Sequence, residues 1–184
     1  MGYFRKITGE HLYLSPFDAE DTEIQFKWAK WMNDRDVSDT FDGHKNHTSL
    51  SNVKISLQEL TGYRYFIVLS EDDTLIGQIS LHNVDHLHRN AFLGIMIGEV
   101  EYHGKGYGTE AAQLVLDYGF NTLNLNNIAL SVHEDNHAGI ACYKKLGFKE
   151  YGRRREAFFK NGKFYDVIYM DILAREFNKY SVKE

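Results

Sequence analysis

Three glycines alternate with larger residues in the segment His103-Gly104-Lys105-Gly106-Tyr107-Gly108-Thr109. An apolar run, Ala91 to Ile97, precedes this segment, and an amphipathic helical pattern follows it. Glycine lets a backbone approach a ligand closely, and the free N–H groups at a helix N-terminus attract anions. The spacing is therefore typical of a phosphate-binding turn, although a tight strand-to-helix connection without a ligand would have the same sequence.

The glycine turn matches neither of two common phosphate-binding motifs. The Walker loop ends in Gly-Lys followed by Ser or Thr, which this turn lacks. The dinucleotide fingerprint requires Gly-x-Gly-x-x-Gly with an acidic residue about 20 positions further on. The turn alone leaves both interpretations open.

A second segment, residues 132–148, favours the phosphate interpretation. Its notable residues are Asn136, Ala138, Ala141, Tyr143, Gly147 and Phe148. Together with the glycine turn, it resembles the GCN5-related N-acetyltransferase (GNAT) superfamily, whose turn reads Gln/Arg-x-x-Gly-x-Gly/Ala. The resemblance covers nearly the whole chain and is strongest to the branch with ribosomal-protein N-terminal acetyltransferases and bacterial spermidine acetyltransferases.

The resemblance implies transfer of an acetyl group from acetyl-CoA, as co-substrate, to an amine. Backbone N–H groups of the turn would bind the CoA pyrophosphate, and the main chain of the preceding strand would pair with the pantetheine arm. His103 replaces the family's Gln or Arg, which would remove one side-chain contact to phosphate. The residues expected to bind the cofactor are Ile95, Met96, Ile97, His103, Gly104, Lys105, Gly106, Tyr107, Gly108, Thr109, Asn136 and Lys145.

Tyr143 is the expected catalytic acid. Aminolysis of a thioester expels a thiolate, which a positioned phenol can protonate. Thiol and phenol have reference pKa values of about 8.5 and about 10, so this proton transfer costs little. The alternative is a helix tyrosine packed in the core. For Asn136 the alternative to a pantetheine contact is a helix N-cap, and one side chain can serve both.

The general base is less clear. Relatives often carry an acidic residue on the strand where this chain has Phe92. Glu134 and His133, at the end of the next apolar strand, are both candidates for the catalytic base. The alternative is a pair of exposed groups at the end of a strand.

Four aspartates lie between the first two expected helices: Asp34, Asp36, Asp39 and Asp42. In GNAT relatives this region covers the acceptor cleft, where carboxylates would favour a cationic amine such as a polyamine or a peptide N-terminus. The alternative is a solvated acidic loop. No metal is expected, because His82, His86 and His88 lie around a turn without a cysteine nearby.

The remaining sequence pattern supplies the elements that must position these residues. Strands are expected at 10–15, 63–69, 75–82, 90–97, 128–132, 148–159 and 163–173, and helices at 18–32, 49–60, 106–121 and 136–146. A helical crossover favours parallel pairing of the strands at 90–97 and 128–132. We expect an α/β, GNAT-like single domain over residues 1–184, with the last few residues as a tail. Its mixed, mostly antiparallel sheet has about seven strands flanked by about four helices.

Composition limits the classes of function. The net charge of −5 argues against a nucleic-acid binder, and Cys142 as the single cysteine allows no intramolecular disulfide. The absence of a signal peptide or an apolar membrane span predicts a cytoplasmic protein. The final hairpin could supply the edge of a homodimer.

Three hypotheses remain at this point. The first is an N-acetyltransferase for a small amine, and the second is the same enzyme class with a protein N-terminus or an amino sugar as acceptor. The third is a non-catalytic acyl-CoA-binding module on the same fold.

Overall fold

The computed structural model describes residues 3–16, 18–40, 48–59 and 62–177. In these residues the strands are β1 (Ile7–Thr8), β2 (Leu12–Pro16), β3 (Tyr63–Leu69), β4 (Leu75–Asp85), β5 (Asn90–Ile97), β6 (Asn127–His133), β7 (Lys149–Lys160) and β8 (Lys163–Leu173). The α-helices are α1 (Thr22–Asn33), α2 (Arg35–Ser38), α3 (Leu50–Glu59), α4 (Tyr107–Asp117), α5 (His137–Lys145) and α6 (Ala174–Phe177). A 3₁₀ turn, η2 (Val100–Tyr102), precedes α4, and a π-helical turn, η3 (Tyr118–Thr122), follows it.

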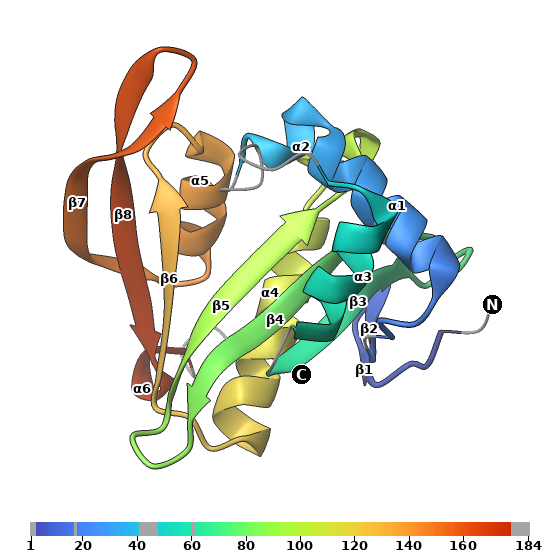
Figure 1. Ribbon diagram of the computed structural model, residues 1–184. Helices are drawn as coiled ribbons and strands as arrows, with labels where there is room; N and C mark the ends of the chain where they lie inside the picture. Colours follow the sequence, from blue (N-terminus) through green and yellow to red (C-terminus); the bar gives the residue numbers. More distant parts are fainter. Residues whose placement is uncertain (1–2, 17, 41–47, 60–61, 178–184) are drawn as a thin grey trace.

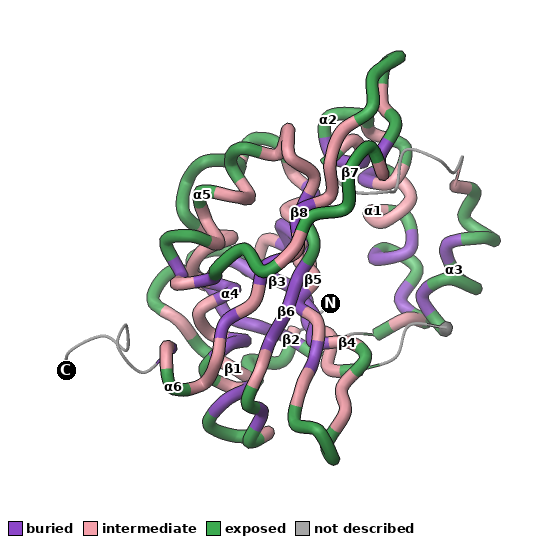
Figure 2. Tube along the Cα trace, turned by 90° about the vertical axis from the view of Figure 1, so that its left-hand side faces the viewer, coloured by how far each residue is buried: buried purple, intermediate pink, exposed green. Residues whose placement is uncertain are grey.

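The described strands form one sheet in the order β1-β2-β3-β4-β5-β6-β8-β7. Every neighbouring pair is antiparallel except β5 and β6, which are parallel as the helical crossover predicted. Helices α1 and α3 lie on one side of the sheet, and α4 and α5 lie on the other (Figures 1 and 2). The expected mixed, mostly antiparallel α/β fold is confirmed.

The sheet opens between its two central strands. β5 pairs with β6 over three residues only, from Asn90 opposite Asn127 to Phe92 opposite Ala129. Beyond this point β5 continues along β4, β6 continues along β8, and the two strands diverge (Figure 1). On the β6 side, the main chain of residues 93–97 therefore faces no strand among the described residues.

Each side of the sheet carries its own hydrophobic core. The core beneath α4 includes Ala111, Ala112, Val115 and Leu116, which recur at helical spacing. The core beneath α1 and α3 is centred on Trp31, which is 1% exposed. The predicted apolar stripes of α1 and α4 therefore do face the sheet.

Several element boundaries differ from the prediction. α1 begins at Thr22 rather than at residue 18, because the Asp21 side chain accepts hydrogen bonds from the N–H groups of Glu23 and Ile24 and caps the helix there. β1, α2 and α6 were not predicted, because two to four residues are too few to show a periodic pattern. The count of about seven strands and four helices was therefore low. The expected C-terminal tail lies outside the described residues.

Two predicted turns are confirmed by backbone dihedral angles. Gly147 has φ 98° where the helix before it ends, and Asn161 and Gly162 have φ 52° and 79° at the tip of the β7–β8 hairpin. Both positive φ values match a two-residue hairpin turn. Within the described ranges, no helix is long and apolar enough to cross a membrane.

α1 is anchored to the segment that leads from β5 to the glycine turn. Glu99 forms ion pairs with Lys27 at 3.1 Å and Lys30 at 3.0 Å, both on α1. Gly98 packs so closely on Trp31 that a Cβ atom added there would lie 2.1 Å from Trp31 Cδ2. The start of the glycine turn is thus held against the α1 core.

The Gly98→Ala substitution is expected to destabilise the protein by about 1–3 kcal/mol, because the added methyl group overpacks a fully buried contact. Urea unfolding monitored by circular dichroism measures the change. Gly152→Ala on β7 is the matched control, since a Cβ atom there meets nothing within 4 Å. Equal stability of the two variants would contradict the packing described for Gly98.

Candidate active site

A cavity of about 450 Å³ lies at the opening between β5 and β6. Its walls come from the end of β5, the glycine turn, the first turn of α4 and helix α5. It is lined by Thr40, Ile95, Met96, Ile97, Tyr102, His103, Gly104, Gly106, Gly108, Thr109, Asn136, Ala138, Gly139, Ala141, Cys142, Tyr143 and Lys145. The structure therefore brings together Tyr143 and all of the expected cofactor residues except Lys105 and Tyr107.

The glycine turn has the backbone geometry of an anion cradle. Gly104 and Gly106 have φ values of 73° and 91°, which favour glycine, and a Cβ atom at either position would point into open space. The first N–H within α4 to reach an intrahelical carbonyl is that of Glu110, which donates to Gly106 O at 3.0 Å. The N–H groups of residues 107–109 are therefore left for other acceptors.

His103 connects the turn to β5. Its Nε2 atom lies 2.8 Å from the carbonyl oxygen of Ile97, at hydrogen-bond distance if that nitrogen carries the proton. The side chain that replaces the family's Gln or Arg thus contacts the protein's own backbone. We infer that it fixes the turn relative to the strand.

Tyr143 lines the cavity from α5. Its ring packs edge-on against Phe148, with centroids 5.8 Å apart. Burial raises the pKa of the phenol, and the neighbouring Cys142 adds to the rise. The hydroxyl forms no hydrogen bond with any residue that the structure describes. It is a protonated group with its donor available.

Cys142 and Thr109 join the two helices that border the cavity. Thr109 Oγ1 and Cys142 Sγ are 3.2 Å apart, one on α4 and the other on α5. Burial raises the pKa of the Cys142 thiol, although Thr109 and Lys145 act in the opposite direction. The thiol is therefore a weak nucleophile near neutral pH.

Asn136 caps α5, since its Oδ1 accepts a hydrogen bond from the N–H of Gly139 at 2.9 Å. This confirms the N-cap interpretation. Because Asn136 also lines the cavity, the cap does not remove it from contact with a ligand.

The two candidates for the general base do not line the cavity. Glu134 Oε1 accepts a hydrogen bond from the N–H of Asp166 at 2.9 Å, and its Oε2 lies 3.4 Å from Arg153. His133 stacks on Phe158 with centroids 3.5 Å apart. Both groups have structural partners, and a role as base stays a prediction.

The four aspartates between the first two expected helices do not form one common site among the described residues. Asp34 caps α2 by accepting a hydrogen bond from the N–H of Asp36, and the Asp39 carbonyl oxygen contacts Lys160. Asp42 lies outside the described residues. Thr40, directly after Asp39, lines the cavity, and no sequence pattern had indicated it.

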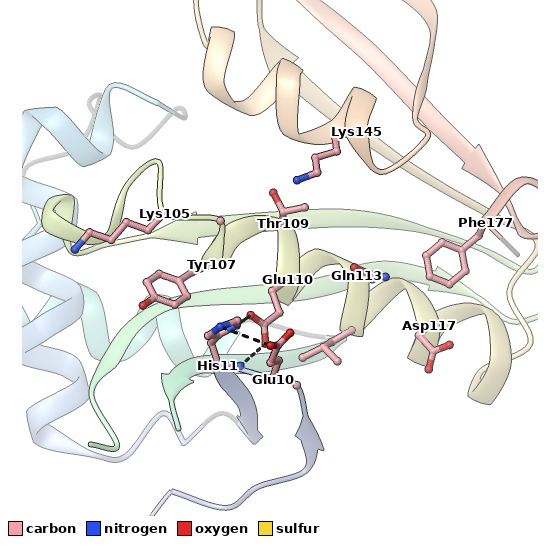
Figure 3. A pocket seen from close by; sticks show the side chains of 13 residues that line it. Glu10, His11, Lys105, Tyr107, Thr109, Glu110, Gln113, Asp117, Lys145 and Phe177 are labelled. Carbon is pink, nitrogen blue, oxygen red and sulfur yellow. Dashed lines mark hydrogen bonds and ion pairs between the residues drawn. The ribbon is translucent and has the colours of Figure 1, made fainter. Parts of the chain in front are cut away.

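A second cavity of about 720 Å³ adjoins the first along α4 (Figure 3). Lys105 and Tyr107 lie here, while Gly106, Thr109 and Lys145 border both cavities. Glu110 lines this cavity and accepts hydrogen bonds from the N–H of His11 at 2.9 Å and of Leu12 at 3.3 Å. The two cavities are therefore neighbours that share the first turn of α4 and Lys145.

A family model described as the Acetyltransferase (GNAT) domain matches residues 11–149, about three quarters of the chain. The protein belongs to the GNAT acetyltransferase family. A provisionally named ribosomal N-acetyltransferase, YdaF of Bacillus subtilis (strain 168), is 30% identical over 168 residues, covering 89% of this chain and 90% of YdaF. The family and its named relatives identify this GNAT protein as an acetyl-CoA-dependent acyltransferase.

Two further similar proteins are named as spermidine acetyltransferases. The spermidine N(1)-acetyltransferase of Escherichia coli (strain K12) is 39% identical over 110 residues, which span 60% of this chain and 59% of that protein. The crystal structure of Vibrio cholerae spermidine N-acetyltransferase in complex with CoA and spermine superposes with a TM-score of 0.80. It is 26% identical and covers 92% of this chain and 99% of its own. These matches agree with the GNAT fold expected from the sequence.

Proposed function

We propose that this protein moves the acetyl group of acetyl-CoA to a primary amine of a small, cationic, polyamine-like molecule by direct attack. The observation that carries the proposal is that one cavity is lined by three features together: the glycine cradle, the unpaired edge of β5 and Tyr143. The polyamine class is supported by the spermidine acetyltransferase relatives. A protein N-terminus is the alternative acceptor, supported by the similarity to YdaF.

Acetyl-CoA has three parts that fit three features of the cavity. The pyrophosphate is an anion, and the N–H groups of residues 107–109 have no acceptor within α4, next to Gly104 and Gly106, which leave room for it. The pantetheine arm carries amide groups, which can pair with the side of the main chain of residues 93–96 that faces no described strand, as an added strand would. Lys145 borders both cavities and can approach a phosphate at their junction.

The transfer requires one bond to form and one to break at the thioester. The neutral amine attacks the acetyl carbonyl carbon, the C–S bond of the resulting tetrahedral intermediate breaks, and CoA leaves as a thiolate. Tyr143 donates its hydroxyl proton to this sulfur. Burial keeps the phenol protonated, and because it raises the pKa it also makes the proton costlier to release than the reference pKa values imply. The amine's own proton is lost to a base or to water.

The acceptor is tested by measuring thiol release from acetyl-CoA in the presence of polyamines, amino sugars and peptides with free N-termini. We expect the highest kcat/KM for a polyamine. A preference for N-terminal peptides would support the alternative acceptor. Acetyl-CoA binding without thiol release for any acceptor would instead support a non-catalytic acyl-CoA-binding module.

The location of the acetyl-CoA site can be tested through Cys142, the single cysteine of the chain. Because burial raises the thiol pKa, we expect iodoacetamide to label Cys142 slowly near pH 7 and faster as the pH approaches 9. Saturating acetyl-CoA is expected to slow this labelling about tenfold or more, since occupancy of 90% of the sites leaves about a tenth of them open. Intact-protein mass spectrometry measures the labelling. Equal rates with and without bound acetyl-CoA would place the cofactor elsewhere.

A further inference from the structure

Beyond the cavity, two hydrogen bonds join α2 and the residue that follows it to the tip of the β7–β8 hairpin. Arg35 Nη2 donates a hydrogen bond to Asn161 Oδ1 at 3.1 Å. Lys160 Nζ donates a hydrogen bond to the carbonyl oxygen of Asp39 at 3.4 Å. These contacts bridge the two halves of the sheet on the far side of the opening between β5 and β6.

Lys160 is the most enclosed member of this bridge. Its side chain is 16% exposed and forms an ion pair with Asp135, two residues beyond the end of β6. The ammonium also lies 5.9 Å from the ring of Phe158 and 5.7 Å from that of Tyr165. Lysine is rarely buried this far without a partner, and removing one member of such a pair leaves the other charge uncompensated. Lys160 therefore joins β7, the end of β6 and the end of α2.

Both partners of Lys160 stand next to a residue that lines the first cavity. Asp39 directly precedes Thr40, and Asp135 directly precedes Asn136. Thr40 follows α2, and Asn136 caps α5. The Lys160 ammonium group thus contacts both Asp39 and Asp135, the residues that precede Thr40 and Asn136.

We propose that Lys160 is a positioning residue for the acceptor amine. By tying Asp39 to Asp135, it fixes Thr40, the cavity wall that lies outside the cofactor segments, while Asn136 keeps its own hydrogen bond to Gly139. This inference rests on the proposed acetyl transfer to an amine, and it adds a residue that touches neither the thioester nor the phosphates.

The Lys160→Met substitution removes the charge and keeps the aliphatic stem. We expect the KM for spermidine to rise about fivefold or more, while the Kd of acetyl-CoA changes less than about twofold. Deuterium exchange of peptides covering 35–40 and 161–166 is expected to become faster, because the bridge that protects them is lost. Lys160→Arg keeps the charge, so it should return the spermidine KM and the deuterium exchange toward their wild-type values.

The control is Lys163→Met, which makes the same change directly across the hairpin from Lys160, at an exposed position. It should leave the spermidine KM and both exchange rates at their wild-type values. Arg35→Ala, also on the surface, is a second variant of the bridge that should accelerate the same exchange if Lys160→Met does not fold.

The proposal would be overturned if deuterium exchange of these peptides were unchanged in both Lys160→Met and Arg35→Ala. It would also be overturned if Lys163→Met changed the exchange and the spermidine KM as much as Lys160→Met does. A loss of acetyl-CoA affinity that matches the loss of acceptor affinity would overturn it as well. Failure of the proposed function has a different result: wild-type protein would transfer no acetyl group, while exchange in the variants would still report the bridge.

Discussion

Tyr143→Phe is expected to lower kcat by about 10²–10⁴-fold, the usual contribution of a general acid. The Kd of acetyl-CoA should change by less than about twofold, because the ring that packs on Phe148 is retained and only the hydroxyl is lost. Stopped-flow or thiol-release kinetics at saturating substrates gives kcat, and isothermal titration gives Kd. The loss should appear in kcat because the proton moves only after both substrates are bound.

The pH dependence provides an additional test of Tyr143. An acid must be protonated to act, and burial raises the pKa of this phenol above its usual value of about 10. The wild-type rate should therefore not fall through loss of this proton at any pH up to about 10. Tyr151→Phe, at a position that is 56% exposed on β7, is the matched control and should leave kcat and Kd unchanged. A Tyr143→Phe enzyme with wild-type kcat at saturation would remove the acid role.

Gly106→Ala is expected to raise the Kd of acetyl-CoA about tenfold to a hundredfold. The φ of 91° is strained for alanine, and a shift of the turn would misalign the N–H groups that are proposed to bind the pyrophosphate. Hydrogen bonds to a charged group contribute about 1.5–3 kcal/mol each, so losing one of them gives an effect of this size. Isothermal titration with acetyl-CoA measures it.

A matched glycine separates this effect from backbone strain. Gly162 at the β7–β8 hairpin tip has φ 79°, and a Cβ atom there would also meet nothing within 4 Å. Gly162→Ala should cost a similar amount of stability, about 1–2 kcal/mol, and leave the Kd of acetyl-CoA unchanged. Similar losses of affinity in both variants would mean that the glycine turn is not the phosphate cradle.

The sequence predicted the long elements well because their patterns repeat. The apolar stripe of α4 spans three turns, and the strand at 90–97 was placed with its exact ends. α2 could not be found in this way, because its four residues are set by the Asp34 cap and not by a stripe. The start of α1 was missed for the same reason, since several acidic residues precede it and only Asp21 caps the helix.

Part of the candidate site could be predicted from the sequence for a similar reason. Its cofactor side lies on two contiguous segments, so one stretch of sequence contains the glycine turn and another contains Asn136 and Tyr143. The opposite wall includes Thr40, which is distant in sequence, and Lys160 contacts the residue before Thr40 only through the tertiary fold. Likewise, the pattern around Glu134 could not show that its carboxylate is bonded to Asp166 and Arg153.

The most direct test of acetyl-CoA-dependent transfer uses acetyl-CoA with an isotopically labelled acetyl group and spermidine as acceptor. Mass spectrometry of the polyamine, together with the amount of free CoA thiol, follows the label after incubation with the wild-type protein. We expect one labelled acetyl group on a primary amine for each thiol released, at a rate that depends on the protein. Acetyl-CoA that remains intact, or thiol release with no label on any amine acceptor, would contradict this account.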